Sequence, residues 1–375
     1  MRSRQPIHIL GIGNLGKLVA HSLRKSHPET PITLLFHRPG LVDDWNKAGQ
    51  SIEVVRNGEL DRQSKFDYEL VSTEQSPIRN LVVATKAYAT AQSLKPLRDR
   101  LAPSSTLLFL QNGIGTYNIF IPFLRLGVEL GITHAQLPLG TIDEVTSSLF
   151  DQSSRPNYLA GILNHGVYTT GPFSAVHAGF ADTILGPALP PSTTALASSR
   201  QEETSFLIQQ ILSAPMLAAS LVSPSELFQA QLQKLAINAI INPLTVIFDC
   251  LNGELFHSTA IRVLIQAIIS ELSTVIRAII ASRNGNLDPA IFAKFSPENL
   301  EKAISDVGAK TAKNVSSMRQ DVRAGRKTEI DYINGYIIAR GADYGIECPQ
   351  NSKLVDLVKG KTLISESQIP EVFRI

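Results

Sequence analysis

Short apolar runs alternate with amphipathic segments through the first 110 residues of the chain. Strand-like runs cover Ile7 to Leu10, Ile32 to Phe36, Asn80 to Ala84 and Thr106 to Leu110. Helical spacing follows the first run and recurs from about Thr90 to Arg100. Strands that alternate with helices are typical of a parallel sheet covered by helices. The pattern therefore predicts an α/β fold that begins with a Rossmann-type, doubly wound parallel sheet.

The pattern changes near residues 131 and 222. Between these points, short β-like pieces rich in Gly, Thr and His are followed by a Pro-rich stretch typical of an exposed loop and by a helical segment. Helical spacing then dominates to about residue 361. We therefore predict two domains, residues 1–221 with the Rossmann-type sheet and residues 222–375 all-helical. The segments behind this prediction are Tyr168 to Phe173 and Ala175 to Gly179 for strands, 187–195 for the loop, and Glu203 to Leu212, Ala260 to Ser282 and Glu329 to Ala342 for helices.

Composition and charge narrow the class of protein. The 375-residue chain is 43% hydrophobic, which is enough for a large core and favours two domains. Its net charge is only +2 and it has no long basic run, so neither a nucleic-acid surface nor an anionic membrane face is expected. No uninterrupted apolar stretch reaches the length of a membrane span, and the first strand starts too early for a signal peptide. The two cysteines, Cys250 and Cys348, suit neither a disulfide framework nor a zinc site. We therefore expect a soluble cytoplasmic protein without a metal site.

A glycine pattern joins the first predicted strand to the first predicted helix. Its three glycines are spaced as Gly-x-Gly-x-x-Gly, directly between these two elements. In that context the first glycine permits a tight turn, the second lets the backbone approach a pyrophosphate, and the third lets the helix pack on the strand. The helix N-terminus also favours an anionic phosphate. We therefore predict a dinucleotide site formed by Gly11, Gly13, Asn14, Leu15 and Gly16.

The end of the second predicted strand bears on which dinucleotide is bound. An acidic residue there would accept a hydrogen bond from an adenosine ribose hydroxyl of NAD(H), but the chain has His37, Arg38 and Pro39 after Phe36. An arginine at this position can pair with a 2′-phosphate. We therefore expect NADP(H), with an exposed arginine that merely begins a loop as the alternative.

Two further strand ends carry polar residues, Lys86 after the third run and Asn112 after the fourth. In an open α/β sheet the ligand crevice lies at the carboxyl ends of the strands. Both residues are therefore candidates to contact cofactor or substrate. Each is equally compatible with turn chemistry, especially the Asn112-Gly113 pair.

One apolar segment of the second half carries three polar side chains on a single helical face. Lys234, Asn238 and Asn242 are spaced four residues apart, so at helical pitch they stack over two turns. Asparagine is a mediocre helix former, and a surface helix normally uses Glu, Lys or Gln instead. Pro243 also removes the donor to the Ala239 carbonyl and should kink the helix. We interpret this face as part of a polar pocket, the alternative being an ordinary solvated helix surface.

A third block, Asn314 to Gly335, contains a Ser-Ser-Met turn and then a glutamate that enters an amphipathic helix. Together with the glycine pattern and the Lys234 face, in this order, it resembles the ketopantoate reductase (2-dehydropantoate 2-reductase) family. The likeness runs from Ile7 to about Lys361. It implies a Rossmann domain followed by a helical domain, and NADPH-dependent reduction of 2-dehydropantoate to (R)-pantoate in pantothenate and coenzyme A biosynthesis.

The resemblance also implies roles for individual residues. It makes Lys234 the general acid, and the chemistry suits an ammonium, which can stabilise the developing oxyanion and donate its proton. Glu329 matches a site-lining glutamate that can keep the lysine protonated. Arg38 matches the adenosine-phosphate contact, and Lys86 and Asn112 match residues in the cleft between domains. The residues implied to hold the substrate are Asn238, Asn242, Asn252, Asn314 and Ser317, the last through the substrate carboxylate.

Two alternatives stay open at this point. A relative with the same scaffold can reduce another 2-oxo acid, and a dinucleotide-binding regulatory protein can keep the fold without catalysis. The segment from about Phe120 to Gln201 is longer than a compact family member needs, and it suits a lid, a dimer contact or a neutral insertion.

The resemblance implies a small-molecule 2-oxo acid as the binding partner. The sequence leaves open which acid it is and whether the chain forms a homodimer.

Overall fold

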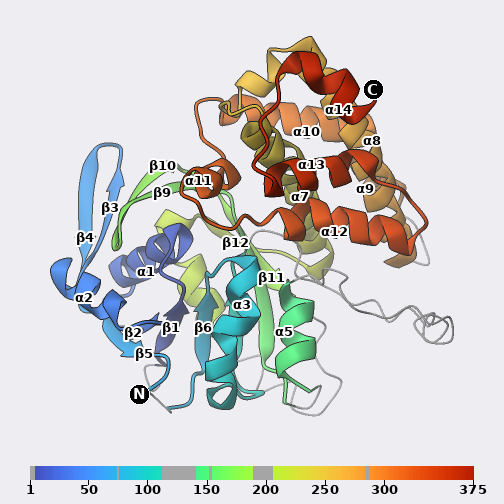
Figure 1. The fold of residues 1–375 in the computed structure, drawn as a ribbon. Coiled ribbons are helices and arrows are strands. Elements are labelled where there is room, and N and C mark those ends of the chain that lie inside the picture. Colours follow the sequence, from blue (N-terminus) through green and yellow to red (C-terminus); the bar gives the residue numbers. More distant parts are fainter. Residues whose placement is uncertain (1–4, 74–75, 112–140, 152–153, 189–205, 284–287) are drawn as a thin grey trace. The chain divides into compact units, whose positions relative to one another are not determined.

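The computed structural model describes residues 5–73, 76–111, 141–151, 154–188, 206–283 and 288–375 (Figure 1). In this part of the chain, two compact units divide between Phe228 and Gln229. The first unit contains a mostly parallel sheet with helices, and the described part of the second consists of helices. The predicted fold class is therefore confirmed. The predicted domain boundary near residue 222 lies just before helix α7 (Pro224–Ile247), and the units divide inside this helix.

The first unit is built on an eight-stranded sheet. From one edge to the other its strands are β12 (Ala219–Leu221), β11 (Thr183–Pro187), β8 (Asn157–Leu163), β7 (Thr106–Phe109), β6 (Asn80–Val83), β1 (Ile7–Leu10), β2 (Ile32–Phe36) and β5 (Asp67–Leu70). The six neighbours from β8 to β5 are parallel, whereas β11 runs antiparallel to β8. All four strands predicted from apolar runs are present. The sheet is mixed at one edge, where we expected it to be parallel throughout.

The helices of this unit cover the sheet. They are α1 (Asn14–Ser26), α2 (Gly40–Lys47), α3 (Ala87–Leu94) with the 3₁₀ turn η1 (Lys95–Arg100), α5 (Thr141–Leu149), a helical stretch over 206–212 and the 3₁₀ turn η2 (Pro215–Leu217). The helix predicted from Thr90 to Arg100 is in fact α3 followed by η1. The reason is Pro96, which cannot donate to the carbonyl of Gln92 and clashes with it, so the α-helical part ends at Leu94.

A second, four-stranded sheet was only partly predicted. Its order is β4 (Glu59–Gln63), β3 (Ile52–Arg56), β10 (Ser174–Gly179) and β9 (Gly166–Gly171). The predicted β-like pieces are confirmed as the antiparallel pair β9 and β10. The other pair, β3 and β4, was not predicted. Strand β4 has the sequence Glu-Leu-Asp-Arg-Gln, which shows no clear apolar alternation and so does not indicate a strand.

Helix α1 lies between the two sheets and joins them (Figure 1). Its Lys17 is 2% exposed and donates hydrogen bonds to the carbonyls of Gly171 and Ser174, both at 2.9 Å, and to the hydroxyl of Thr169. These acceptors belong to the β9–β10 hairpin. The buried ammonium thus pins the small sheet to the helix that follows the glycine turn.

The second unit packs its helices around α8. They are α7, η3 (Glu254–Phe256), α8 (Thr259–Arg283), α9 (Pro289–Lys294), α10 (Pro297–Lys310), α11 (Ser317–Arg323), α12 (Ile330–Asp343), α13 (Pro349–Lys359), η4 (Glu366–Gln368) and α14 (Ile369–Phe373). Helix α8 contacts α10, α12, α13 and α14. It is the one helix of the described chain long and apolar enough to cross a membrane, but 56% of that stretch is buried inside the protein. Core helices of soluble proteins have the same character, so this is weak evidence for a membrane span.

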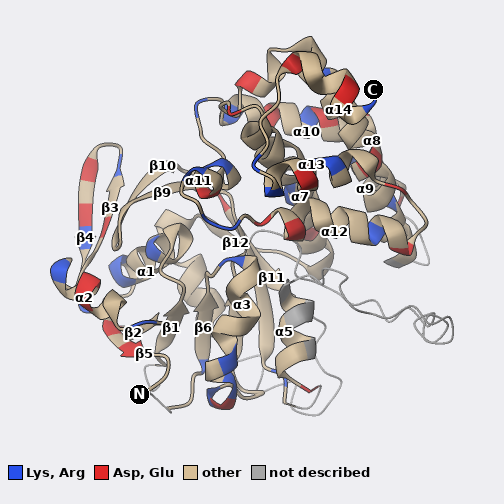
Figure 2. Cartoon of the chain, viewed as in Figure 1, with Lys and Arg blue, Asp and Glu red and all other residues tan. Residues whose placement is uncertain are grey.

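Charged residues are distributed over both units rather than gathered on one segment. Figure 2 shows no charge on the central strands β1, β2 and β6, whereas α2 and β4 carry both signs. This agrees with uncharged strands buried in a sheet covered on both faces.

The burial of Lys17 predicts how stability depends on pH. Desolvation lowers the pKa of Lys17 to about 8, whereas the pKa of a lysine in an unfolded chain is about 10.4. Between these values the unfolded chain holds a proton that the folded chain has lost, so the free energy of unfolding rises with pH. We expect the free energy of unfolding of the wild type, relative to that of Lys17→Met, to rise by about 3 kcal/mol between about pH 8 and about pH 10.4. Urea unfolding followed by the fluorescence of Trp45, the only tryptophan, measures this difference in the first unit. A difference that falls with pH would show that the oxygen acceptors outweigh desolvation.

Candidate active site

The glycine turn of the first unit has the close contacts that its spacing predicts. Gly11 has a φ of +95°, and a Cβ there would lie 2.7 Å from the backbone of Ala84 and Thr85. A Cβ on Gly16 would lie 1.9 Å from the carbonyl oxygen of Gly11, so helix α1 approaches the turn as only glycine allows. At Gly13, the N-cap of α1, a Cβ would meet nothing within 4 Å. The helix N-terminus is thus open at the position where a phosphate group would approach.

The neighbours of this turn are held by the small sheet and the core. The Asn14 side chain donates to the carbonyl of Val167 at 3.1 Å, so β9 holds the first residue of α1. Leu15 is half-buried against the hydrophobic core. The first turn of α1 contains no acidic residue that would repel an anion. This end of α1 is therefore held by β9 and the core, has no carboxylate in its first turn, and has open space at Gly13.

The other residues predicted to bind the cofactor follow neighbouring strands. Arg38 is exposed just after β2, and Lys86 is half-buried after β6, at the N-cap of α3. Because β1, β2 and β6 are parallel, both lie at the same sheet edge as the glycine turn. Asn112 lies outside the described residues, as do parts of the long 120–201 segment.

Gln111 also lies at this edge, although the sequence analysis named only its neighbour Asn112 as a candidate. It follows β7, and its side-chain amide donates to the carbonyl of Val83 at 3.1 Å and toward the Thr85 hydroxyl at 3.4 Å. Its Oε1 is buried and has no donor among the described residues. A buried acceptor without a donor is costly, so this atom is a candidate contact for a bound ligand. Its position at the end of an apolar run was the available signal.

In the second unit, helix α7 carries the predicted polar face. Lys234 and Asn238 are half-buried and Asn242 is 6% exposed. Leu235 and Ala239, which follow Lys234 and Asn238 in the chain, are apolar and buried. The helix also continues through Pro243 to Ile247. The three side chains therefore lie on a partly buried face of the helix rather than on a freely solvated one.

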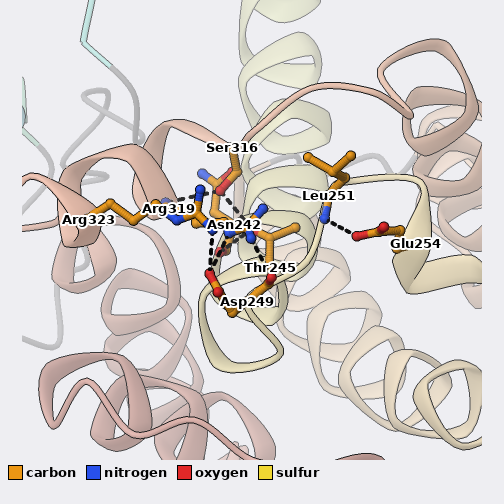
Figure 3. Close-up of polar contacts among 8 residues, drawn as sticks. All are labelled: Asn242, Thr245, Asp249, Leu251, Glu254, Ser316, Arg319 and Arg323. Atoms are coloured by element: carbon orange, nitrogen blue, oxygen red, sulfur yellow. Dashed lines mark hydrogen bonds and ion pairs between the residues drawn. The ribbon is translucent and has the colours of Figure 1, made fainter.

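A hydrogen-bonded cluster fixes the end of α7 against the start of α11 (Figure 3). Thr245 Oγ1 is hydrogen-bonded to the Asn242 carbonyl at 2.9 Å and to the Ser316 hydroxyl at 2.7 Å. Ser316 is the N-cap of α11 and accepts from the Arg319 backbone N–H at 3.1 Å. The cluster places the exposed Ser317 on the first turn of α11, beside the end of the helix that carries Asn242.

Arg319 and Asp249 complete this cluster. Asp249 follows α7 with a φ of +44°, and Arg319 donates to its carboxylate at 2.8 Å and also to its carbonyl. Arg323 donates to the same carboxylate at 3.0 Å. These contacts hold the pKa of Asp249 below its usual value, chiefly through the hydrogen bond from Arg319. Sequence reasoning missed Ser316, Thr245 and Arg319, although a serine at the start of a helix is a recognisable N-cap signal.

Two of the predicted asparagines, Asn252 and Asn314, are adjacent in space. The Asn252 backbone N–H donates to the Asn314 carbonyl at 3.2 Å, and its side-chain amide donates to the Thr311 hydroxyl at 3.0 Å. Thr311 gives its own proton to the Val307 carbonyl, so it must accept from the Asn252 Nδ2. The Asn252 Oδ1 is consequently the free end of the amide. It is buried and has no donor among the described residues.

Glu329 is 4% exposed and lies at the N-cap of α12. Asn334, five residues further along α12, donates to the Ala239 carbonyl of α7 at 2.8 Å. The helix that follows Glu329 is thus hydrogen-bonded, through Asn334, to the helix that carries Lys234.

Comparison with known proteins identifies the family. A ketopantoate reductase model matches residues 7–190, and the model of the C-terminal part of the same family matches residues 226–362. The chain belongs to the ketopantoate reductase family. It is 28% identical to ketoisovalerate reductase of Beauveria bassiana, with 97% of this chain and 84% of that one aligned. It is 26% identical to 2-dehydropantoate 2-reductase of Saccharomyces cerevisiae, with 97% and 96% aligned.

The fold is also that of solved structures. A ternary structure of D-mandelate dehydrogenase with NADH and anilino(oxo)acetate aligns with a TM-score of 0.67 and 21% identity, covering 97% of this chain and 99% of that one. As a ketopantoate reductase family member, the protein is an oxidoreductase that acts on a small molecule. A nicotinamide dinucleotide is the cofactor that the family and the strand–turn–helix together support. No group of three metal-binding side chains was found in the described residues.

Proposed function

We propose that this protein reduces 2-dehydropantoate to (R)-pantoate with NADPH, with Lys234 as the proton donor. The observation that carries the proposal is the polar face of α7, where Lys234, Asn238 and Asn242 follow one another at helical spacing among buried apolar residues such as Leu235 and Ala239. Polar groups are retained in such a place only if something compensates their desolvation. A bound 2-oxo acid, with its carboxylate and carbonyl oxygens, would accept hydrogen bonds from the donors on this face.

The residues of the chain provide the acid side of the reaction. A dihydronicotinamide, when bound, supplies the hydride to the carbonyl carbon. The carbonyl oxygen gains negative charge as the hydride arrives, and the Lys234 ammonium stabilises that charge and gives its proton to form the 2-hydroxyl. Glu329 favours the charged form of the lysine. Asn238, Asn242 and Asn314 orient the substrate without neutralising the ammonium, and Ser317 donates to its carboxylate.

The proposed choice of NADPH rests on the end of β2. Arg38 is exposed there, and His37, Arg38 and Pro39 supply no carboxylate for a ribose 2′-hydroxyl. Guanidinium pairs with phosphate through charge-assisted hydrogen bonds. Gly11, Gly13, Asn14, Leu15 and Gly16 would hold the pyrophosphate, with Lys86 on the same sheet edge. We propose Asn112, which lies outside the described residues, as a further cofactor contact on the family resemblance alone.

The choice of 2-dehydropantoate rests on Asn252. Its buried Oδ1 lacks a donor among the described residues, and the orientation of the amide is set by Thr311. An acceptor in this state favours a ligand that brings a hydroxyl donor. 2-Dehydropantoate has a hydroxyl group beyond its oxo acid, whereas ketoisovalerate does not. Ketoisovalerate is the second candidate substrate, because a ketoisovalerate reductase is among the relatives that align over nearly the whole chain.

A panel of 2-oxo acids assayed by NADPH absorbance tests the function. We expect kcat/KM for 2-dehydropantoate to exceed that for ketoisovalerate by about 10- to 100-fold, the worth of one buried hydrogen bond of this kind. The Asn252→Leu variant should reduce this ratio, and Asn46→Ala, on the exposed face of α2, should leave it unchanged. Equal turnover of both acids would remove 2-dehydropantoate as the specific substrate, and no NADPH oxidation with any acid would favour a non-catalytic dinucleotide-binding protein.

Substitution of the proposed acid should separate chemistry from cofactor binding. We expect Lys234→Met to lower kcat by about 10²- to 10⁴-fold, because it removes the proton donor while keeping a similar side-chain volume. The Kd of NADPH, measured by calorimetry, should change little, because the glycine turn lies in the other unit. Lys353→Met, on an exposed position of α13, serves as the control. An unchanged kcat would exclude Lys234 from the mechanism.

Substitution of Arg38 should separate the two dinucleotides. We expect Arg38→Ala to weaken NADPH binding by about 10- to 100-fold, the worth of a charge-assisted hydrogen bond, and to leave NADH binding nearly unchanged. Arg62→Ala is a matched control, because Arg62 is exposed on β4 and pairs with Glu53. Equal weakening of both cofactors would show that Arg38 does not bind a 2′-phosphate.

A further inference from the structure

Pro243 leaves one carbonyl in the middle of α7 without its usual helical partner. In a regular helix the backbone N–H of residue 243 would donate to the carbonyl of residue 239, but proline has no N–H. Ala239 is fully buried, so water cannot replace the lost donor. This carbonyl lies between Asn238 and Asn242, the two asparagines proposed to hold the substrate.

Asn334 of α12 supplies the missing donor. Its Nδ2 lies 2.8 Å from the Ala239 carbonyl oxygen and also donates to Asn351 Oδ1 at 2.9 Å. Asn334 is 0% exposed, so both contacts are made in the interior of the helical unit. A side chain from a different helix thus replaces a main-chain hydrogen bond of α7.

A carboxylate fixes which way this amide points. Glu271 of α8 accepts from the backbone N–H groups of Gln350 and Asn351, at 2.7 and 3.0 Å, and from the Asn351 Nδ2 at 2.7 Å. The Asn351 amide must therefore present its oxygen to Asn334, which in turn must present its Nδ2. The hydrogen bonds from Glu271 through Asn351 and Asn334 to Ala239 form a relay that links α8, α13, α12 and α7. It starts from the Glu271 carboxylate, which lies at the N-terminus of α13.

The Asn334 side chain is not explained by packing alone. Its Oδ1 is buried and meets no donor among the described residues, which is a cost that an aliphatic side chain would avoid. Among the described residues, its side-chain hydrogen bonds are the two that its Nδ2 donates. Its role therefore lies in those bonds, and one of them ends on the turn of α7 between the proposed substrate residues.

We propose that Asn334 is a positioning residue for the reductase reaction. By holding the Ala239 carbonyl, it sets the turn of α7 that includes Pro243 and so fixes Asn238 and Asn242 relative to one another. The proposal rests on the proposed function of these asparagines. It does not place Asn334 in contact with substrate or cofactor.

A double-mutant cycle with Pro243 tests this role. Asn334→Leu removes the donor, Pro243→Ala restores a main-chain N–H for the Ala239 carbonyl, and the double variant combines both changes. For Asn334→Leu we expect kcat/KM for the 2-oxo acid to fall by about 10- to 100-fold, because small displacements of positioning groups have effects of this size. Its melting temperature should also fall, and the Kd of NADPH should stay within about twofold, since the relay lies in the helical unit.

The double variant separates positioning from stability. We expect it to recover the melting temperature, since the carbonyl again has a donor, but not kcat/KM, since an ordinary helical hydrogen bond changes the turn between Asn238 and Asn242. Recovery of both quantities would reduce Asn334 to a structural role and overturn the proposal. If Asn334→Leu does not fold, the double variant still gives this comparison against Pro243→Ala.

Asn299→Leu is the matched control. Asn299 also donates its side-chain amide to a backbone carbonyl, that of Ala293, at 2.8 Å, but it is exposed on α10. We expect its kcat/KM to match that of the wild type. If the wild-type protein reduces no 2-oxo acid, the proposed function fails. If the wild type is active and Asn334→Leu is equally active, only the positioning role fails.

Discussion

The helical unit depends on how one buried carbonyl is satisfied. Pro243 removes the main-chain donor to Ala239 in the interior of α7, and a carbonyl left without a partner there would cost about 1–3 kcal/mol. Asn334 supplies the donor, Asn351 orients Asn334, and Glu271 orients Asn351 while capping α13. A chain of this kind has only one consistent arrangement of donors and acceptors. The Ala239 carbonyl of α7 is therefore linked by hydrogen bonds to side chains from three other helices.

The first unit meets a similar constraint with different chemistry. Two backbone segments approach each other too closely for any side chain at Gly16, where a Cβ would lie 1.9 Å from the Gly11 carbonyl oxygen. The result is a helix N-terminus with open space at Gly13. Lys17, the next residue after Gly16, is buried and ties the same helix to the β9–β10 hairpin. Both devices make the turn rigid, which suits a phosphate site in which backbone N–H groups must be held in place.

The family and the arrangement of polar groups support the same chemistry. Each unit carries one part of the proposed reaction: a dinucleotide turn in the first, and a lysine with amides in the second. The buried acceptors Gln111 Oε1 and Asn252 Oδ1 add to this division, since Gln111 follows β7 at the sheet edge proposed to bind the cofactor and Asn252 is one of the proposed substrate residues.

The sequence by itself determined the α/β and helical halves, the first four strands of the large sheet, and the glycine turn. These features arise from local patterns, namely apolar runs, helical spacing and glycines at fixed offsets, so they can be read without the fold. It also placed Lys234, Asn238 and Asn242 on one face, because helical pitch alone sets that. The tertiary structure decided the rest: the second sheet, whose charged strand β4 depends on pairing with β3, the antiparallel β11, and the partners of Pro243 and Ser316. Asn334 and Arg319 lie 95 residues from Ala239 and 70 from Asp249 along the chain. Contacts between residues so far apart leave no periodic signal in the sequence, because they form only when separate helices pack together.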